Sequence, residues 1–302
     1  MLMWLLACTS APETPIKTDL QQVTLALNWL PEPEFGGFYE GVLGGHYEQA
    51  GFQVEIMAGG PGAPSLELLQ SGKAQAAISA GDDLLLKRAK GIQAIGVWPA
   101  FQDAPNGLMV REPGPTTFSE IPQSSQVAIE LGSPFQSFLW EQQGWEGKVK
   151  AVPYTGGVGQ FLADPTLIQQ AYITSEVCVA QSKGASVRFL KASDAGWNPY
   201  GTLLALPEPL PEWAPAFVEA TEKSWQAYQA DPGRANAEIN RLNPALTPEI
   251  LACVTKAQAP YLVGSDGLGE MTAKRWSEMA ETLVSLELLS PGSTSDGAWQ
   301  AF

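Results

Sequence analysis

Hydrophobic positions in the first third of the chain follow two alternating periods. Short runs rich in Val, Ile, Leu and Ala predict strands at residues 23–27, 52–56, 76–79 and 92–97. Stretches with helical spacing predict helices at 38–50, at 66–71 with Ser65 as its cap, and from Asp82 or Asp83 to about Gly91. Strands that alternate with helices in this way predict a parallel arrangement in one sheet.

A second series follows a stretch rich in Pro and Gly at residues 105–107 and 112–115. Its predicted strands are 126–130, 149–153, 169–173 and 187–190. Its predicted helices are 135–143, a short one after the glycines at 156–159, and one from Thr174 or Ser175 to Lys183. The helix at 135–143 has Ser133 near its N-cap and Pro134 near its first position, which is a typical helix start.

The chain ends with one more β-type run and a helical tail. The run covers residues 201–206, and the predicted helices are about 210–230, 232–241, 247–255 and 270–288. We therefore predict an α/β fold of two lobes, with mixed sheets flanked by helices. Lobe 1 is expected at 20–107 plus 198–302 and lobe 2 at 108–197, with a ligand site between them.

Composition and charge exclude several classes of function. The 302 residues are 45% hydrophobic and carry a formal charge of −15, which disfavours nucleic acid and a polybasic hold on anionic lipid. His46 is the single histidine, so His-rich metal sites and Ser-His-Asp or Cys-His catalysis are hard to build. We expect no cofactor and no metal, and a chain that works as a monomer.

The first residues resemble a processing signal. Leu5-Leu6-Ala7-Cys8 fits a lipoprotein cleavage site, and a polar, Pro-containing stretch follows it. Residues 1–19 are therefore interpreted as a leader remnant and tether, with a lipid anchor at Cys8. The alternative is an unstructured start with a spare thiol. Cys178 and Cys253 are expected as small buried thiols, with a disulfide between them as the alternative.

Five segments together resemble a known family. They are 24–31 (TLALNWLP), 36–41 (GGFYEG), 44–56 (GGHYEQAGFQVEI), 71–78 (SGKAQAAI) and 169–176 (QQAYITSE). The chain resembles periplasmic substrate-binding proteins of ABC importers from about residue 23 to 206. The resemblance is nearest to the branch that binds pyrimidine precursors of thiamin, and binders of alkanesulfonates, taurine and riboflavin are relatives. It implies the two-lobed type II fold and a permease partner in the membrane.

The sequence also departs from that family. Phe35 stands where some relatives have His, and Val177 stands where a Pro often follows the Ser-Glu pair. Pyrimidine-synthesis enzymes share the fold but use a His, a Lys and a Cys-rich iron motif. No Cys-rich run is present, and His46 falls within the Gly-His-Tyr segment. An enzyme on this fold is therefore the less favoured alternative, and a sensor module is a third.

In lobe 1, the candidate ligand residues follow predicted strands, where open α/β sheets bind ligands. Trp29 offers a flat face for stacking a heteroaromatic ring, and Asn28 offers a donor and an acceptor. Phe35 and either Phe38 or Tyr39 are expected to line the site, and Gly36-Gly37 would let backbone approach the ligand. Ser79 and Asp82 are candidates for hydrogen bonds to the ligand, although Asp82 is equally well explained as a helix cap.

In lobe 2 and the second crossing, the candidates follow the same logic. Ser133, Tyr154 and Thr155 lie at predicted strand ends, where helix N-termini would suit an anionic group. Thr174 and Glu176 open a helix, and Glu176 is a candidate acceptor for an aminopyrimidine or a partner for a cation. Tyr200 or Trp197 is expected to close over the ligand or to brace the hinge. The sequence thus predicts an extracytoplasmic, membrane-anchored protein that binds a small heteroaromatic ligand, with riboflavin or an alkanesulfonate as alternatives.

Overall fold

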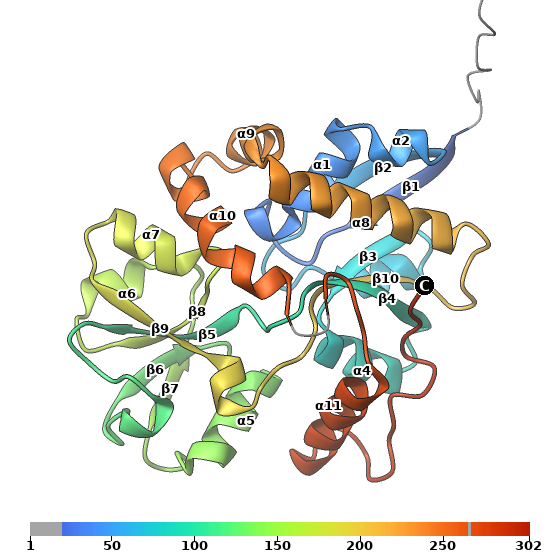
Figure 1. Cartoon of the computed structure of the whole chain (residues 1–302). Coiled ribbons are helices and arrows are strands. Elements are labelled where there is room, and N and C mark those ends of the chain that lie inside the picture. The colour runs from blue at the N-terminus through green and yellow to red at the C-terminus, as the bar shows by residue number, and fades with distance from the viewer. Residues whose placement is uncertain (1–19, 265–266) are drawn as a thin grey trace, which may run out of the picture.

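The computed structural model describes residues 20–264 and 267–302 and contains two mixed sheets flanked by helices, as predicted (Figure 1). The predicted leader and Cys8 lie outside the described residues. Sheet A has the order β2-β1-β3-β10-β4, with bounds Gln21–Ala26 (β1), Phe52–Met57 (β2), Ala76–Ser79 (β3), Ala94–Phe101 (β4) and Gly201–Pro207 (β10). Sheet B has the order β7-β6-β8-β5-β9, with bounds Asn106–Arg111 (β5), Gln126–Ile129 (β6), Lys150–Pro153 (β7), Ile168–Tyr172 (β8) and Val187–Lys191 (β9).

Each sheet contains one strand that runs against its neighbours. In sheet A, β1 pairs in parallel with β2 and β3, while the returning strand β10 is antiparallel to β3 and β4. In sheet B, β6 is parallel to β7 and β8, and β5 is antiparallel to β8 and β9. The parallel strands place several carboxyl ends at one edge of each sheet, where a ligand site is expected.

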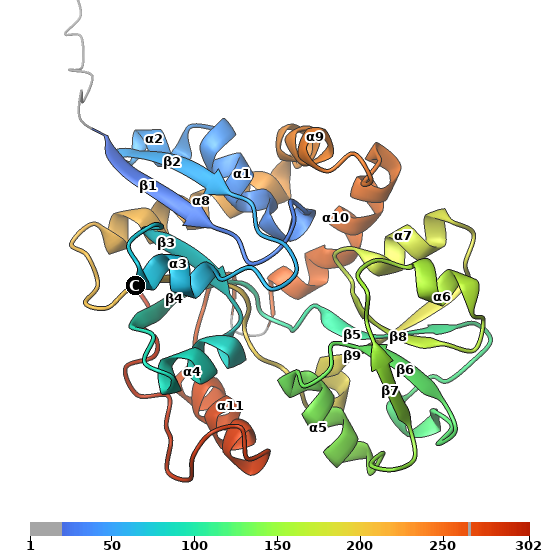
Figure 2. The same ribbon diagram turned by 180° about the vertical axis from the view of Figure 1, so that it is seen from behind.

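The helices divide between the two sheets (Figures 1 and 2). We call sheet A with its helices lobe 1 and sheet B with its helices lobe 2. The helices of lobe 1 are Gly36–Leu43 (α1), His46–Gln49 (α2), Ser65–Gln70 (α3), Gly81–Ala89 (α4), Ala214–Ala230 (α8), Gly233–Leu242 (α9), Pro248–Leu262 (α10) and Ala273–Ser285 (α11). Those of lobe 2 are Pro134–Gln143 (α5), Gly159–Ala163 (α6) and Glu176–Ser182 (α7). Among the described residues, no helix meets the length and hydropathy needed to span a membrane.

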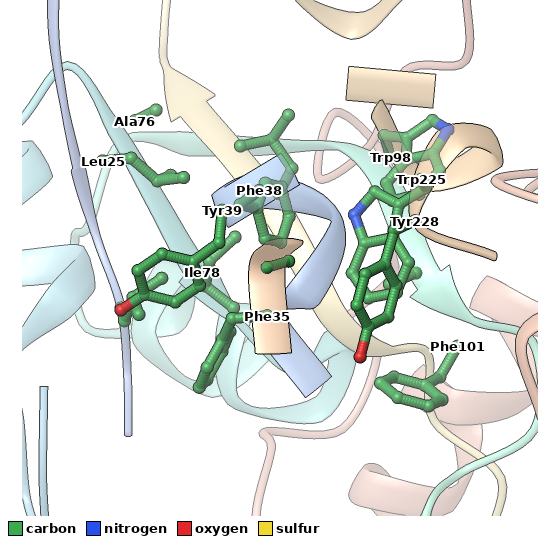
Figure 3. Close-up of a cluster of buried hydrophobic side chains, with 14 of the residues drawn as sticks. Leu25, Phe35, Phe38, Tyr39, Ala76, Ile78, Trp98, Phe101, Trp225 and Tyr228 are labelled. Carbon is green, nitrogen blue, oxygen red and sulfur yellow. The ribbon is translucent and has the colours of Figure 1, made fainter. Parts of the chain in front are cut away.

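The lobe 1 core lies between sheet A and helices α1 and α8 (Figure 3). Phe38 of α1 meets Trp225 of α8 edge to face, with 5.7 Å between ring centroids. A Cβ added to Gly37 would lie 2.2 Å from the Trp225 ring, so this glycine lets α1 approach α8. The expectation that the backbone at Gly37 approaches a ligand is therefore wrong, because that space is filled by the indole of Trp225.

Three local expectations also need correction. The helix predicted over 38–50 is interrupted after Leu43, because Gly45 adopts a left-handed conformation with φ of 71°. Ser65 does not cap α3, since its hydroxyl donates to the Ile78 carbonyl instead. Residues 106–111, over which no strand was predicted, form strand β5 between β8 and β9. By contrast, the predicted cap at Ser133 is confirmed, since its hydroxyl accepts the amide of Gln136.

Two chain crossings join the lobes, between β4 and β5 and between β9 and β10. Asn198 ties them together, because its Oδ1 accepts the Ala104 amide at 2.7 Å and its Nδ2 donates to Asp103. A third connection is covalent: Cys178 of α7 forms a disulfide with Cys253 of α10. The preferred interpretation of these cysteines as free thiols is therefore wrong, because the folding of α7 against α10 brings together sulfurs that are 75 residues apart in sequence.

Candidate functional site

The carboxyl end of β1 leads directly into the junction between the lobes. Asn28 and Trp29 follow this strand and are half-buried. Trp29 packs on the edge of the lobe 1 core. The buried Oδ1 of Asn28 has no hydrogen-bond partner among the described residues. A buried acceptor without a partner is costly, so this oxygen is available to a ligand donor.

Glu34 connects lobe 1 to lobe 2. It lies in a short 3-10 turn, Pro33–Phe35, and is only 7% exposed. Its Oε2 accepts a hydrogen bond from the Thr174 hydroxyl at 3.0 Å, across the junction. The pKa of Glu34 is raised to about 7, mainly by burial; the hydrogen bond from Thr174 opposes this shift and the charge of Glu176 adds to it.

A second buried carboxyl group lies beside it. The pKa of Glu32 is raised mainly by burial, and the charges of Glu34 and Glu176 add to this shift. Hydrogen bonds from Ser175 of lobe 2 and from the Trp29 indole favour its charged form and partly oppose that shift. The candidate stacking residue Trp29 is therefore oriented by a carboxyl group that itself touches the other lobe.

The third buried carboxylate is that of Glu176, the first residue of α7. The Tyr154 hydroxyl donates to its Oε1, and the Tyr172 amide donates to its Oε2 at 2.8 Å. Tyr154 is held in turn by the Gly157 amide, which donates to its hydroxyl at 3.0 Å. Burial raises the pKa of Glu176, and these two hydrogen bonds to the carboxylate oppose the shift.

Asp82 of lobe 1 lies close enough to Glu130 of lobe 2 for the two charges to interact. Asp82 lies in the first turn of α4, and its buried Oδ1 has no hydrogen-bond partner among the described residues. The pKa of Asp82 is raised to about 7, mainly by burial and to a smaller extent by the charges of Asp83 and Glu130. The expectation that Asp82 caps this helix is wrong, because α4 begins at Gly81 and its N-cap is Ala80.

Tyr172 lies among these groups at the end of β8. The residue is 37% exposed, but its phenol lies among carboxylates from both lobes. Burial of the phenol raises the pKa of Tyr172, and the charges of Glu34, Glu130 and Asp82 raise it further. Tyr172 offers a ligand an aromatic side chain on the lobe 2 side of the junction.

Together these side chains form one set, which we call the inter-lobe site. Its members are Asn28, Trp29, Glu32, Glu34, Asp82, Glu130, Tyr154, Tyr172, Thr174, Ser175 and Glu176. The charges that raise the pKa values of its carboxyl groups are those of other carboxylates. Such a set favours a ligand that brings hydrogen-bond donors or positive charge, and it disfavours a free anion.

Other predicted residues lie outside this set. Phe35 is fully buried and Tyr39 is 5% exposed, and both pack in the lobe 1 core (Figure 3). Tyr200 is 1% exposed, and its hydroxyl accepts the Thr272 amide. Ser79 donates to a carboxylate oxygen of Asp83. A ligand role for these four residues stays a prediction.

Two lobe 2 candidates and Trp197 also have local explanations. Ser133 is committed to capping α5, and Thr155 is an exposed neighbour of Tyr154. Trp197 is fully buried and packs against Phe138 near the second crossing. Their contacts are compatible with bracing the fold, and a direct ligand role for them also stays a prediction.

Five members of the inter-lobe site were not predicted as site residues: Glu32, Glu34, Glu130, Tyr172 and Ser175. Each lay close to a signal that was visible in the sequence. Glu130 and Tyr172 lie at the ends of the predicted strands 126–130 and 169–173, and the two glutamates at 32 and 34 follow the β1 run by a few residues. Nothing in the sequence indicated that carboxylates from distant segments would be buried together.

Comparison with known proteins supports the same architecture. Residues 32–124 match the family model described as NMT1/THI5 like. The riboflavin-binding protein RibY of Chloroflexus aurantiacus is 23% identical over 94% of this chain and 86% of its own length.

Solved structures give the fold. The periplasmic aliphatic sulphonate binding protein SsuA of Escherichia coli superposes with a TM-score of 0.70 at 15% identity, covering 91% of this chain and 95% of its own. The alkanesulfonate-binding protein SsuA of Xanthomonas axonopodis pv. citri, bound to MOPS, has a TM-score of 0.68 at 13% identity and covers 94% and 100%. The predicted two-lobed binding-protein fold is therefore confirmed.

Proposed function

We propose that this chain, which has a periplasmic-binding-protein fold and an NMT1/THI5-like segment, is an extracytoplasmic solute-binding protein of an ABC importer. Its ligand is a small heteroaromatic compound, with a pyrimidine precursor of thiamin favoured. The ligand binds at the inter-lobe site and contacts both lobes, so it stabilises the closed arrangement. A permease in the membrane then receives the ligand from the closed protein.

The observation that carries this proposal is the buried, oriented carboxylate of Glu176 beside Trp29, Glu32 and Glu34. Tyr154 and the Tyr172 amide fix the Glu176 carboxylate, and Trp29 hydrogen-bonds Glu32. An aminopyrimidine has a flat ring that suits stacking on an indole and an amino group that donates to carboxylates. A sulfonate would bring a full negative charge among carboxyl groups that already raise one another's pKa values, so it could bind only with those groups protonated, which makes the alkanesulfonate alternative less favourable.

Riboflavin is the second candidate ligand. It is favoured by the similarity to a riboflavin-binding protein over 94% of this chain. Its fused ring system is flat and carries an imide N–H that can donate to a carboxylate. The two candidates differ in size, so direct binding measurements separate them.

Binding is preferred over catalysis on positional grounds. The His46 Nε2 lies 3.9 Å from the Glu40 carboxylate, and Glu40 is also paired with Arg234 of α9. Helix α2, which carries His46, lies on the side of lobe 1 away from lobe 2 (Figure 1). A pyrimidine-synthesis enzyme on this fold would carry iron or pyridoxal phosphate after purification, whereas the proposed binder needs neither.

Location outside the cytoplasm is supported by the Cys178–Cys253 disulfide, since such bonds persist mainly in oxidising compartments. We propose that a lipid on Cys8 anchors the protein to the membrane and that it works as a monomer. Mass spectrometry of the membrane-extracted protein tests the anchor, because acylation of Cys8 adds the mass of the acyl chains to the N-terminal peptide.

Isothermal titration with three ligands tests the function. The expected result is heat of binding with the aminopyrimidine precursor of thiamin or with riboflavin, and none with taurine. Glu176→Gln should weaken binding by about 10-fold or more, because a hydrogen bond to a charged group is lost. Glu55→Gln, on the exposed face of β2, is the matched control and should bind normally. Binding of taurine alone would refute the proposed ligand class.

A further inference from the structure

The Cys178–Cys253 disulfide joins the two lobes and not two parts of one lobe. Cys178 lies on α7 of lobe 2, and Cys253 lies near the middle of α10 (Figure 1). Helix α10 is fastened to lobe 1, where the Asn236 side chain of α9 donates to Thr255 at 3.0 Å. A covalent bond between α7 and α10 is therefore a bond between the lobes.

The same two helices hold both sides of the contact between Glu34 and Thr174. The Gln258 amide of α10 donates to the Pro33 carbonyl at 3.2 Å, one residue before Glu34. On the other side, Thr174 lies four residues before Cys178. The disulfide thus fixes the supports of the Glu34–Thr174 hydrogen bond relative to each other.

Helix α10 also reaches the crossings between the lobes. The Tyr261 carbonyl at its end accepts the amides of Gln102 and Asp103 in the first crossing, at 2.8 and 3.1 Å. The Lys191 ammonium of lobe 2 lies over the Tyr261 ring, 4.9 Å from its centroid. Cys253 precedes Tyr261 by eight residues, which is about 12 Å along a helix.

The lobes are therefore connected at two points along α10, at the crossings and at the disulfide. Two bodies joined at two separate points can rotate only about the line through them. That line follows α10, so groups near it hardly move. The Asp82–Glu130 pair belongs to α4 and to the end of β6, which lie on the side of the junction away from α10 and α7 (Figure 2). This side is free to separate.

We propose that the Cys178–Cys253 disulfide is a latch that keeps the lobes joined at Glu34 and Thr174 without ligand and confines opening to the Asp82–Glu130 side. The ligand then enters from that side, into a site half of which is already assembled. The free-energy cost of closing the lobes on binding is then smaller, so the latch increases the affinity for the ligand. This inference concerns motion and holds for any ligand of the inter-lobe site.

Two distances measured by pulsed electron resonance in the full chain without ligand test the latch. Cys8→Ser removes the remaining thiol, and maleimide spin labels are attached at exposed positions through introduced cysteines. One pair, at Lys183 and Lys256, spans α7 and α10, and the other, at Lys90 and Gln142, spans α4 and α5. The same pairs are measured after Cys178→Ser with Cys253→Ser.

With the disulfide intact, the Lys183–Lys256 distribution should be single and narrow, and the Lys90–Gln142 distribution broader. Without the disulfide, the Lys183–Lys256 distribution should broaden and shift to longer distance. If the double variant does not fold, reduction of the folded, labelled protein with dithiothreitol gives the same comparison, since maleimide linkages survive it. A Lys183–Lys256 distribution that is broad with the disulfide, or unchanged without it, would overturn the latch. Neither outcome bears on the proposed solute binding, which the titrations test separately.

Discussion

Replacing the buried Glu34 by Gln should make the protein more stable at alkaline pH. The pKa of this carboxyl is raised from 4.5 to about 7 in the folded state, mainly by burial. A carboxyl with a raised folded-state pKa contributes stability below its unfolded pKa and loses it as pH rises through the folded value. The window for Glu34 therefore runs from pH 4.5 to about 7.

The size of the effect follows from the shift. A difference of 7 − 4.5 = 2.5 pKa units corresponds to about 3 kcal/mol between the protonated and charged extremes. About 1.4 kcal/mol of this contribution to the free energy of unfolding is already lost by about pH 5.5. The free energy of unfolding should therefore fall by about another 2 kcal/mol between about pH 5.5 and about pH 8. For a chain of 302 residues, this is about 3 °C in melting temperature. The Gln side chain keeps an oxygen that can accept the Thr174 hydroxyl.

Thermal unfolding of both proteins across this pH range is the assay. The melting temperature of wild type should fall below that of Glu34→Gln by an amount that grows with pH. Glu55→Gln, on an exposed position of β2, controls for the general loss of one negative charge. Parallel curves for wild type and Glu34→Gln from about pH 5.5 to about pH 8 would refute the burial argument.

Three further changes test the fold by thermal or denaturant unfolding. Ser133→Ala should cost about 1 kcal/mol through the lost N-cap of α5, and an unchanged stability would contradict the cap. Gly37→Ala should cost about 1–3 kcal/mol, because its Cβ would lie 2.2 Å from Trp225; a neutral result would mean that α1 and α8 are not so close. Removing the disulfide by Cys178→Ser with Cys253→Ser should cost about 4 kcal/mol for a separation of 75 residues, and no loss would mean that the bond is not formed.

Local chemistry made part of the fold predictable from sequence. The cap at Ser133 and the strand at 76–79 depend on neighbouring residues and on a short apolar run. The break in the first helix also has a local cause, but it was not predicted. Gly44 and Gly45 lie within a stretch of helical hydrophobic spacing, and the helix is broken by the left-handed φ of Gly45.

Other features depended on partners that the sequence does not identify. Strand β5 begins at Asn106, after a Pro and before a Gly, so its start has the composition of a turn, and it pairs as a strand with β8 and β9. The disulfide joins cysteines 75 residues apart. The carboxyl groups of Glu32 and Glu34 accept hydrogen bonds from Thr174 and Ser175, which lie just before α7 and far away in sequence.

The site was predictable in position but not in charge. Trp29 and Glu176 were expected from their places at a strand end and a helix start, and both lie in the inter-lobe site. The accumulation of carboxylates was not expected, because each came from a different segment and each alone is an ordinary surface residue. Their mutual burial is a tertiary property, and it changes the expected ligand from any flat molecule to one that brings donors.

Native mass spectrometry of the protein purified without added ligand tests the central claim most directly. The inter-lobe site is expected to retain a flat heteroaromatic molecule with amino or imide donors, and Glu176→Gln is expected to lose it while Glu55→Gln retains it. Retention of an aliphatic sulfonate, or of the same heteroaromatic molecule at equal occupancy in Glu176→Gln, would contradict the account.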